Sequence, residues 1–140
     1  MYLKSEKRDM KDLIVIDTNI IVNALKSVVD GAKSRQLMRD LFNGKYILCV
    51  SSDIVSEYDD VLHRSELGIS PAKVDWLMGW IRTHAFFIEP LPSDEERVKM
   101  RDEKDRPFFD VAKCLDAKLI TRNHKDFPVH ELVTLIDELY

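Results

Sequence analysis

Three short apolar segments, separated by stretches of helical periodicity, constrain the fold more than any other feature of the sequence. They read LIVID at 13–17, YILCV at 46–50 and KLIT at 118–121. Continuous apolar runs of this length, rich in β-branched residues, are typical of strands buried on both faces. Strands that alternate with helical patterns predict an α/β fold with a mainly parallel sheet.

The remaining elements follow from apolar spacing and capping signals. Helices are predicted for 19–26, 32–42, 52–64, a segment that begins at Pro71 and contains Ile81, and a segment from about Asp105 to Leu115. Two further short strands are predicted at 86–89 and 132–136. Residues 1–12 are interpreted as a polar lead-in, and 13–140 as a single domain, since 140 residues suit one compact unit.

Composition limits the function classes. The net charge is −4 and the isoelectric point is near 5.6, which argues against strong non-specific binding of nucleic acid. It does not exclude an enzyme with clustered carboxylates. No apolar run approaches a membrane span and the N-terminus lacks the apolar core of a secretory signal, so we expect a cytoplasmic protein without a membrane partner.

Acidic side chains follow the predicted strands. Asp17 closes the first strand, Glu57 borders the buried face of the helix after the second, and Asp105 begins the helix before the third; Asn123 and Asp126 follow that third strand. Because the carboxyl ends of parallel strands meet at one edge of a sheet, we expect these residues to converge. A divalent cation would compensate such a cluster, and oxygen ligands select Mg²⁺ or Mn²⁺.

Each of these residues also has a simpler interpretation. Asp17 and Asp105 are good N-caps, Glu57 is compatible with an exposed helix surface, and Asn123 is a common turn former. The histidines lack H-x-x-x-H spacing, and no glycine-rich phosphate loop or G-x-S-x-G elbow is present.

Together the motifs resemble a PIN domain. The resemblance rests on LIVIDTNIIVNAL, VSSDIVSEYDDVL and DEKDRPFFDVAKCLDAKLITRNHKDF and runs from about Leu13 to Ile136. It is strongest to the stand-alone prokaryotic PIN proteins that act as VapC-like toxins of toxin–antitoxin systems. It implies a three-layer α/β/α sandwich and a metal-dependent endoribonuclease that uses Mg²⁺ or Mn²⁺.

The resemblance also implies roles for individual residues. Asp17, Glu57 and Asp105 match the acids that hold the metal. The fourth acid stays open, because many relatives have aspartate where this chain has Asn123 and others have it where Asp126 stands. The remaining candidates are polar supports and phosphate contacts: Thr18, Asn19, Ser51 and Thr121 for the former, and Arg106, Arg122, His124 and Lys125 for the latter.

The expected partners are RNA, a small antitoxin protein and a second copy of the chain, as a homodimer or higher homo-oligomer. The segment with Trp76 and Trp80 is either a surface for association or a fully buried helix. Two alternatives remain open: a non-catalytic PIN scaffold that binds RNA or protein, and an aspartate-dependent phosphatase or phosphoacceptor domain. The phosphatase is disfavoured because Asn19 stands where its second aspartate belongs.

Overall fold

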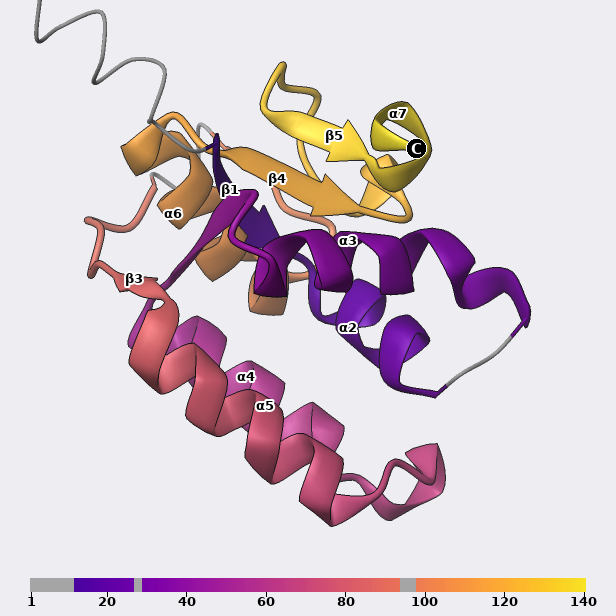
Figure 1. The fold of residues 1–140 in the computed structure, drawn as a ribbon. Coiled ribbons are helices and arrows are strands. Elements are labelled where there is room, and N and C mark those ends of the chain that lie inside the picture. Colours follow the sequence, from indigo (N-terminus) through magenta and orange to yellow (C-terminus); the bar gives the residue numbers. More distant parts are fainter. Residues whose placement is uncertain (1–11, 27–28, 94–97) are drawn as a thin grey trace, which may run out of the picture.

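The fold is built on a sheet of parallel strands. The structure, a computed structural model, describes residues 12–26, 29–93 and 98–140. In this part of the chain five strands pair in the order β3-β2-β1-β4-β5, and every pairing is parallel (Figure 1). The strands are β1 (Asp12–Ile16), β2 (Tyr46–Val50), β3 (Phe86–Phe87), β4 (Lys118–Thr121) and β5 (Val133–Leu135).

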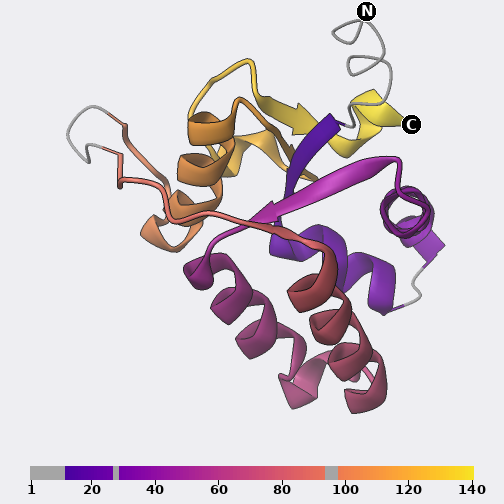
Figure 2. The ribbon, with the colours of Figure 1, turned by 60° about the vertical axis from the view of Figure 1, so that its left-hand side comes forward.

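Helices cover both faces of the sheet, as the predicted three-layer sandwich requires. They are α2 (Thr18–Leu25), α3 (Ala32–Phe42), α4 (Ser52–Leu62), α5 (Pro71–His84), α6 (Arg106–Leu115) and α7 (Ile136–Leu139). Helix α6 packs against β1, β2 and β4, whereas α3 and α7 lie on the opposite side of the sheet (Figure 2). Helices α4 and α5 run side by side and extend away from the sheet in both views.

The central strands form the middle of the core. Ile14, Val15 and Ile16 of β1 are fully buried, and Leu119 and Ile120 of β4 are buried beside them. Helices on both faces account for this, and for the continuous apolar runs in these strands. Among the described residues, no helix is long and apolar enough to cross a membrane.

The strand order reverses beside β1. The chain moves from β1 outward through β2 to β3, and then returns to place β4 and β5 on the other side. The crevice between the carboxyl ends of β1 and β4 is therefore the topological switch point, where α/β sheets bind ligands. The Asp17 amide donates to the Ile120 carbonyl oxygen at 2.9 Å and ties the two strand ends together.

Most predicted elements are present with small differences in length. The strand predicted at 86–89 pairs only at Phe86–Phe87, and the one at 132–136 only at Val133–Leu135. The helix predicted at 52–64 ends at Leu62. Apart from Asp12, which begins β1, the predicted lead-in lies outside the described residues.

Candidate metal centre

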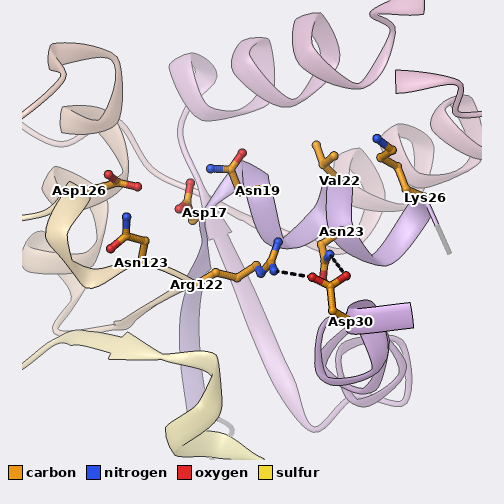
Figure 3. Close-up of a pocket in the computed structure, with 9 residues that line it drawn as sticks. All are labelled: Asp17, Asn19, Val22, Asn23, Lys26, Asp30, Arg122, Asn123 and Asp126. Carbon is orange, nitrogen blue, oxygen red and sulfur yellow. Dashed lines mark hydrogen bonds and ion pairs between the residues drawn. The ribbon is translucent and has the colours of Figure 1, made fainter. Parts of the chain in front are cut away.

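A cleft of about 560 Å³ opens at the switch point (Figure 3). Its walls come from the end of β1, one face of α2, and the segment that follows β4. The lining residues are Asp17, Asn19, Val22, Asn23, Lys26, Asp30, Arg122, Asn123 and Asp126. The predicted location of the site therefore coincides with a polar cleft.

Asp17 is buried at the inner end of this cleft and is only 5% exposed. It occupies the N-cap position of α2, yet its side chain makes no capping hydrogen bond. Instead its Oδ2 accepts a hydrogen bond from the Thr121 hydroxyl at 2.9 Å, across the gap between β1 and β4. Since Thr121 is itself fully buried, this bond fixes the direction of the carboxylate.

Burial raises the pKa of Asp17 to about 6, from an ordinary value of 3.8. The Thr121 hydroxyl opposes the rise because it favours the charged form, and the negative charge of Asp126 adds to it. Figure 3 shows the Asp126 carboxylate directed toward Asp17. The buried charge is thus incompletely compensated by protein groups.

Asp105 brings a second carboxylate from α6. It ends the short 3₁₀ helix η3 (Glu103–Asp105) and precedes α6, and its side chain also makes no capping hydrogen bond. Its pKa is raised to about 7, first by burial and then by the charge of Asp17. Further contributions come from the charges of Asp102, Asp126 and Glu57. These are the interactions expected of carboxylates that share one site.

Asp17 and Asp126 line the cleft, whereas Asp105 and Glu57 lie outside its lining and are related to these acids by the effect of charge on the pKa of Asp105. Glu57, on α4, and Asp126, at the end of the 3₁₀ helix η4 (His124–Asp126), are both half-buried and act on the charge of Asp105. Asn123 has a different local role. Its Oδ1 accepts the Lys125 amide at 3.1 Å and caps η4, which is the turn-forming role that its sequence position allowed.

The donor set fits a hard divalent cation. All of the converging side chains offer oxygen, and the raised pKa values of Asp17 and Asp105 mark a negative charge that a cation would relieve. Within the described ranges, no three acidic, histidine or cysteine side chains form a ready-made cage. Mg²⁺ does not require one, because it is commonly held by one or two carboxylates and several waters.

The polar supports are divided between two locations. Thr18 is buried beside Asp17 with its hydroxyl oxygen lacking a hydrogen-bond partner, and Asn19 is exposed in the cleft. Ser51 lies elsewhere: its Oγ accepts the Ile54 amide at 3.3 Å and caps α4, and it lines a separate cavity of about 270 Å³.

The predicted phosphate contacts also lie in two different places, three of them at or next to the cleft and Arg106 away from it. Arg122 lines the cleft and pairs with Asp30 at 3.1 Å, and His124 and Lys125 are exposed on η4 beside it.

Arg106 is placed differently from its predicted role as a phosphate contact. Its side chain is 7% exposed, and its guanidinium donates to Glu103, the Ser93 hydroxyl and the Val98 carbonyl oxygen. Its Nη2 and the Val98 oxygen are 2.8 Å apart. Arg106 therefore links the start of α6 to Ser93 and Val98, and it lines the separate cavity that also contains Ser51 rather than the cleft.

One part of the cleft was missing from the sequence prediction. Val22, Asn23 and Lys26 line it from α2, and Asp30 lines it from the 3₁₀ helix η1 (Val29–Gly31). A sequence signal was present, because positions 19, 22, 23 and 26 follow the i, i+3, i+4, i+7 pattern of one helix face.

The comparisons with known proteins agree with this geometry. Residues 13–125 match a protein-family model described as PIN domain. A search of curated proteins found no match. PIN domains are generally nucleases, and they generally use divalent metals. With a matching parallel sheet and with acids at the carboxyl ends of its strands, the chain belongs to the PIN domain family.

Proposed function

We propose that the protein is an endoribonuclease that hydrolyses RNA phosphodiester bonds with the help of Mg²⁺ or Mn²⁺. The observation that carries the proposal is the joint placement of Asp17 and Asp105. Each precedes a helix without capping it, and each has a raised pKa that includes a contribution from another carboxylate. The amides of Thr18 and Asn19 at the start of α2 lower the pKa of Asp17 less than the Thr121 hydroxyl does, so capping is not the main role of this carboxylate.

The residues divide the work as follows. Asp17 and Asp105 would hold the cation, and Glu57 and Asp126 would support it with further negative charge. A cation held there would supply an activated water and positive charge beside the phosphate. Thr121 keeps the Asp17 carboxylate pointed into the site through its 2.9 Å hydrogen bond. No side-chain nucleophile is required.

Asp126 is the stronger candidate for the fourth acid. The Asn123 oxygen is already engaged with the Lys125 amide, whereas the charge of Asp126 reaches both Asp17 and Asp105. Asp126 also lies 3.9 Å from Arg101, at the outer limit of an ion pair. We therefore assign the open position to Asp126 and a turn-forming role to Asn123.

The test compares wild type with Asp17→Asn, purified in parallel, on a labelled single-stranded RNA. With Mg²⁺ the wild type should cleave to 3′-hydroxyl and 5′-phosphate ends, and chelation should stop it. Asp17→Asn should lose roughly 10²-fold or more of the rate, as expected when a charge partner of the transition state is removed. Asp60→Asn, which removes an exposed carboxylate of α4, is the matched control.

Two outcomes would defeat the assignment, and a third would reveal a contaminant. Equal cleavage by wild type and Asp17→Asn would show that the acidic centre is not catalytic. Metal-dependent binding of RNA without any cleavage would favour the alternative of a PIN scaffold that binds without cutting. Products with 2′,3′-cyclic phosphate ends would identify a contaminating metal-independent ribonuclease.

The family resemblance extends the proposal to partners. We propose that the protein is the toxin of a type II pair, inhibited by a small antitoxin protein, and that it self-associates. An exposed aromatic cluster supports association: Trp76 is 58% exposed, and Phe42 packs edge-on against both Trp76 and Trp80. This excludes the interpretation of a fully buried helix. Light scattering should give a mass above one chain that falls in Trp76→Ser; a monomeric wild type would contradict this part.

A further inference from the structure

The cleft continues beyond the acids into a cationic arm, formed by Asn23, Lys26, Asp30 and Arg122. We propose that this arm is a second subsite, which binds the phosphate of the nucleotide next to the scissile bond. The inference rests on the proposed function, because it assumes a nucleic-acid strand in the cleft. It adds a binding site that lies outside the metal centre and a residue, Asp30, that positions one of its cations.

The charge changes sign along the cleft. Asp17 and Asp126 lie at one end, and Lys26 and Arg122 line the part that follows α2 (Figure 3). Lys26 is exposed and has no ion-pair partner among the residues that the structure describes. The Lys26 ammonium and the Arg122 guanidinium line the same cleft and offer positive charge to a phosphate, whereas the acidic end accepts one only together with a cation.

Arg122 is held in position rather than left free. Arg122 directly follows the last residue of β4, and its Nη2 donates a hydrogen bond to Asp30 Oδ2 at 3.1 Å. Asp30 in turn accepts the Asn23 side-chain amide at 3.5 Å, so that the three side chains form a chain across the arm (Figure 3). The ion pair contributes little to folding, because its partners are 41% and 69% exposed. Its clearer effect is to fix the direction of the guanidinium.

Asn23 is the unexpected member of this chain. It is 6% exposed on the buried side of a short apolar helix, and its Oδ1 has no hydrogen-bond partner. Burying an amide with an unpaired oxygen is unfavourable, so its presence calls for an explanation. The explanation we infer is that Asn23 holds the Asp30 carboxylate in place at the cleft through its side-chain hydrogen bond.

Because of these contacts, the removal of the Asp30 charge can either strengthen or weaken RNA binding, depending on the role of Asp30. As a bystander, its negative charge would repel a phosphate in the arm, and its removal would tighten RNA binding. As a positioning residue for Arg122, its removal releases the guanidinium and weakens binding. The two roles predict opposite changes, so one substitution separates them.

The experiment measures binding of a fluorescein-labelled, mixed-sequence single-stranded RNA by anisotropy. All variants carry Asp17→Asn, so that cleavage does not interfere. Lys26→Gln and Arg122→Gln should each weaken binding by about 3–10-fold at 0.1 M salt, and each should lower the slope of log K against log salt by about 0.7. Asp30→Asn should also weaken binding, and it should add nothing in the Arg122→Gln background. Lys45→Gln, at the amino-terminal end of β2 and thus at the opposite edge of the sheet, is the matched control.

Several results would overturn the inference. They are tighter binding by Asp30→Asn, additive losses for Asp30→Asn with Arg122→Gln, an unchanged salt slope in Lys26→Gln, or no measurable RNA binding by any variant. Each would leave the proposed function standing if wild type still cleaves RNA with Mg²⁺. Conversely, a functional arm in a protein that never cleaves would support the binding scaffold and retain this subsite.

Discussion

Asp17→Asn is expected to stabilise the metal-free protein, although it alters a buried, hydrogen-bonded side chain. The pKa of Asp17 is about 6 in the folded protein against an ordinary value of 3.8, mainly because burial penalises the charged form. A difference of about 2 in pKa corresponds to about 3 kcal/mol of folding free energy. Asparagine carries no charge, and its oxygen still accepts the Thr121 hydroxyl. We therefore expect a gain of about 2–3 kcal/mol at pH 8.

The pH dependence follows from the direction of this change. Because the folded pKa of Asp17 lies above the unfolded one, the folded protein loses stability as the pH rises from about 4 to above 6, and no further beyond that. Most of the unfavourable folding free energy caused by the charged Asp17 is therefore present at pH 8, and about half of it remains at pH 5. The advantage of Asp17→Asn should shrink accordingly as the pH falls.

Urea denaturation in EDTA at pH 8 and pH 5, for wild type, Asp17→Asn and the control Asp60→Asn, measures both effects. In thermal denaturation at pH 8, the same gain should appear as a rise in melting temperature of roughly 6–10 °C for a domain of this size. Mg²⁺ at a hundred times its dissociation constant should stabilise wild type by about 2.7 kcal/mol and should not stabilise Asp17→Asn. A variant less stable than wild type at pH 8, or a gain that does not change with pH, would refute the reasoning.

Four further substitutions test individual contacts. Arg106→Ala should cost about 2–3 kcal/mol in urea denaturation, because it removes a buried guanidinium with its hydrogen bonds to Glu103, Ser93 and Val98. It should keep cleavage at permissive temperature, and the opposite pattern would support a role in phosphate binding. Thr121→Val removes a donor to the charged form of Asp17, so the acid limb of the pH profile of Mg²⁺-dependent cleavage should move to higher pH; an unchanged limb would contradict the assigned role. Asp126→Asn should weaken Mg²⁺ binding by about tenfold or more in calorimetry, and Asn123→Ala by less than about threefold; the reverse order would return the fourth position to Asn123.

Secondary structure was easiest to predict from the sequence for segments that are buried on all sides. The segments at 13–17, 46–50 and 118–121 form central strands with helices on both faces, so nearly every side chain in them had to be apolar. The edge strands carry a weaker signal. Phe86 and Phe87 are about half exposed and pair with β2 alone, so the length of β3 depends on its neighbour more than on its own residues.

The convergence of the acids could be predicted because parallel strands present their carboxyl ends at one edge. Whether Asp17 caps its helix could not, since the answer depends on a hydroxyl 104 positions away in Thr121. Arg106 likewise stands one residue after an acid of the centre, but the side chain turns to Ser93 and Val98. Local sequence gives the position of such a side chain and not the direction in which it points.

The local role of Asn123 was within reach of the sequence. A hydrogen bond from its side chain to an amide two residues later is a common turn device and needs no tertiary contact. The pattern Asn19, Val22, Asn23 and Lys26 was equally available as one face of a helix. Its importance emerged only when β4 and η1 placed Arg122 and Asp30 opposite it.

The most direct test of the central claim is a crystal structure of the wild type soaked in Mn²⁺, with anomalous diffraction to locate the ion. The account predicts an anomalous peak bounded by the carboxylates of Asp17 and Asp105, close to Asp126 or Glu57, and no such peak in Asp17→Asn. A crystal at Mn²⁺ concentrations that support RNA cleavage, with no ion between Asp17 and Asp105, would contradict it.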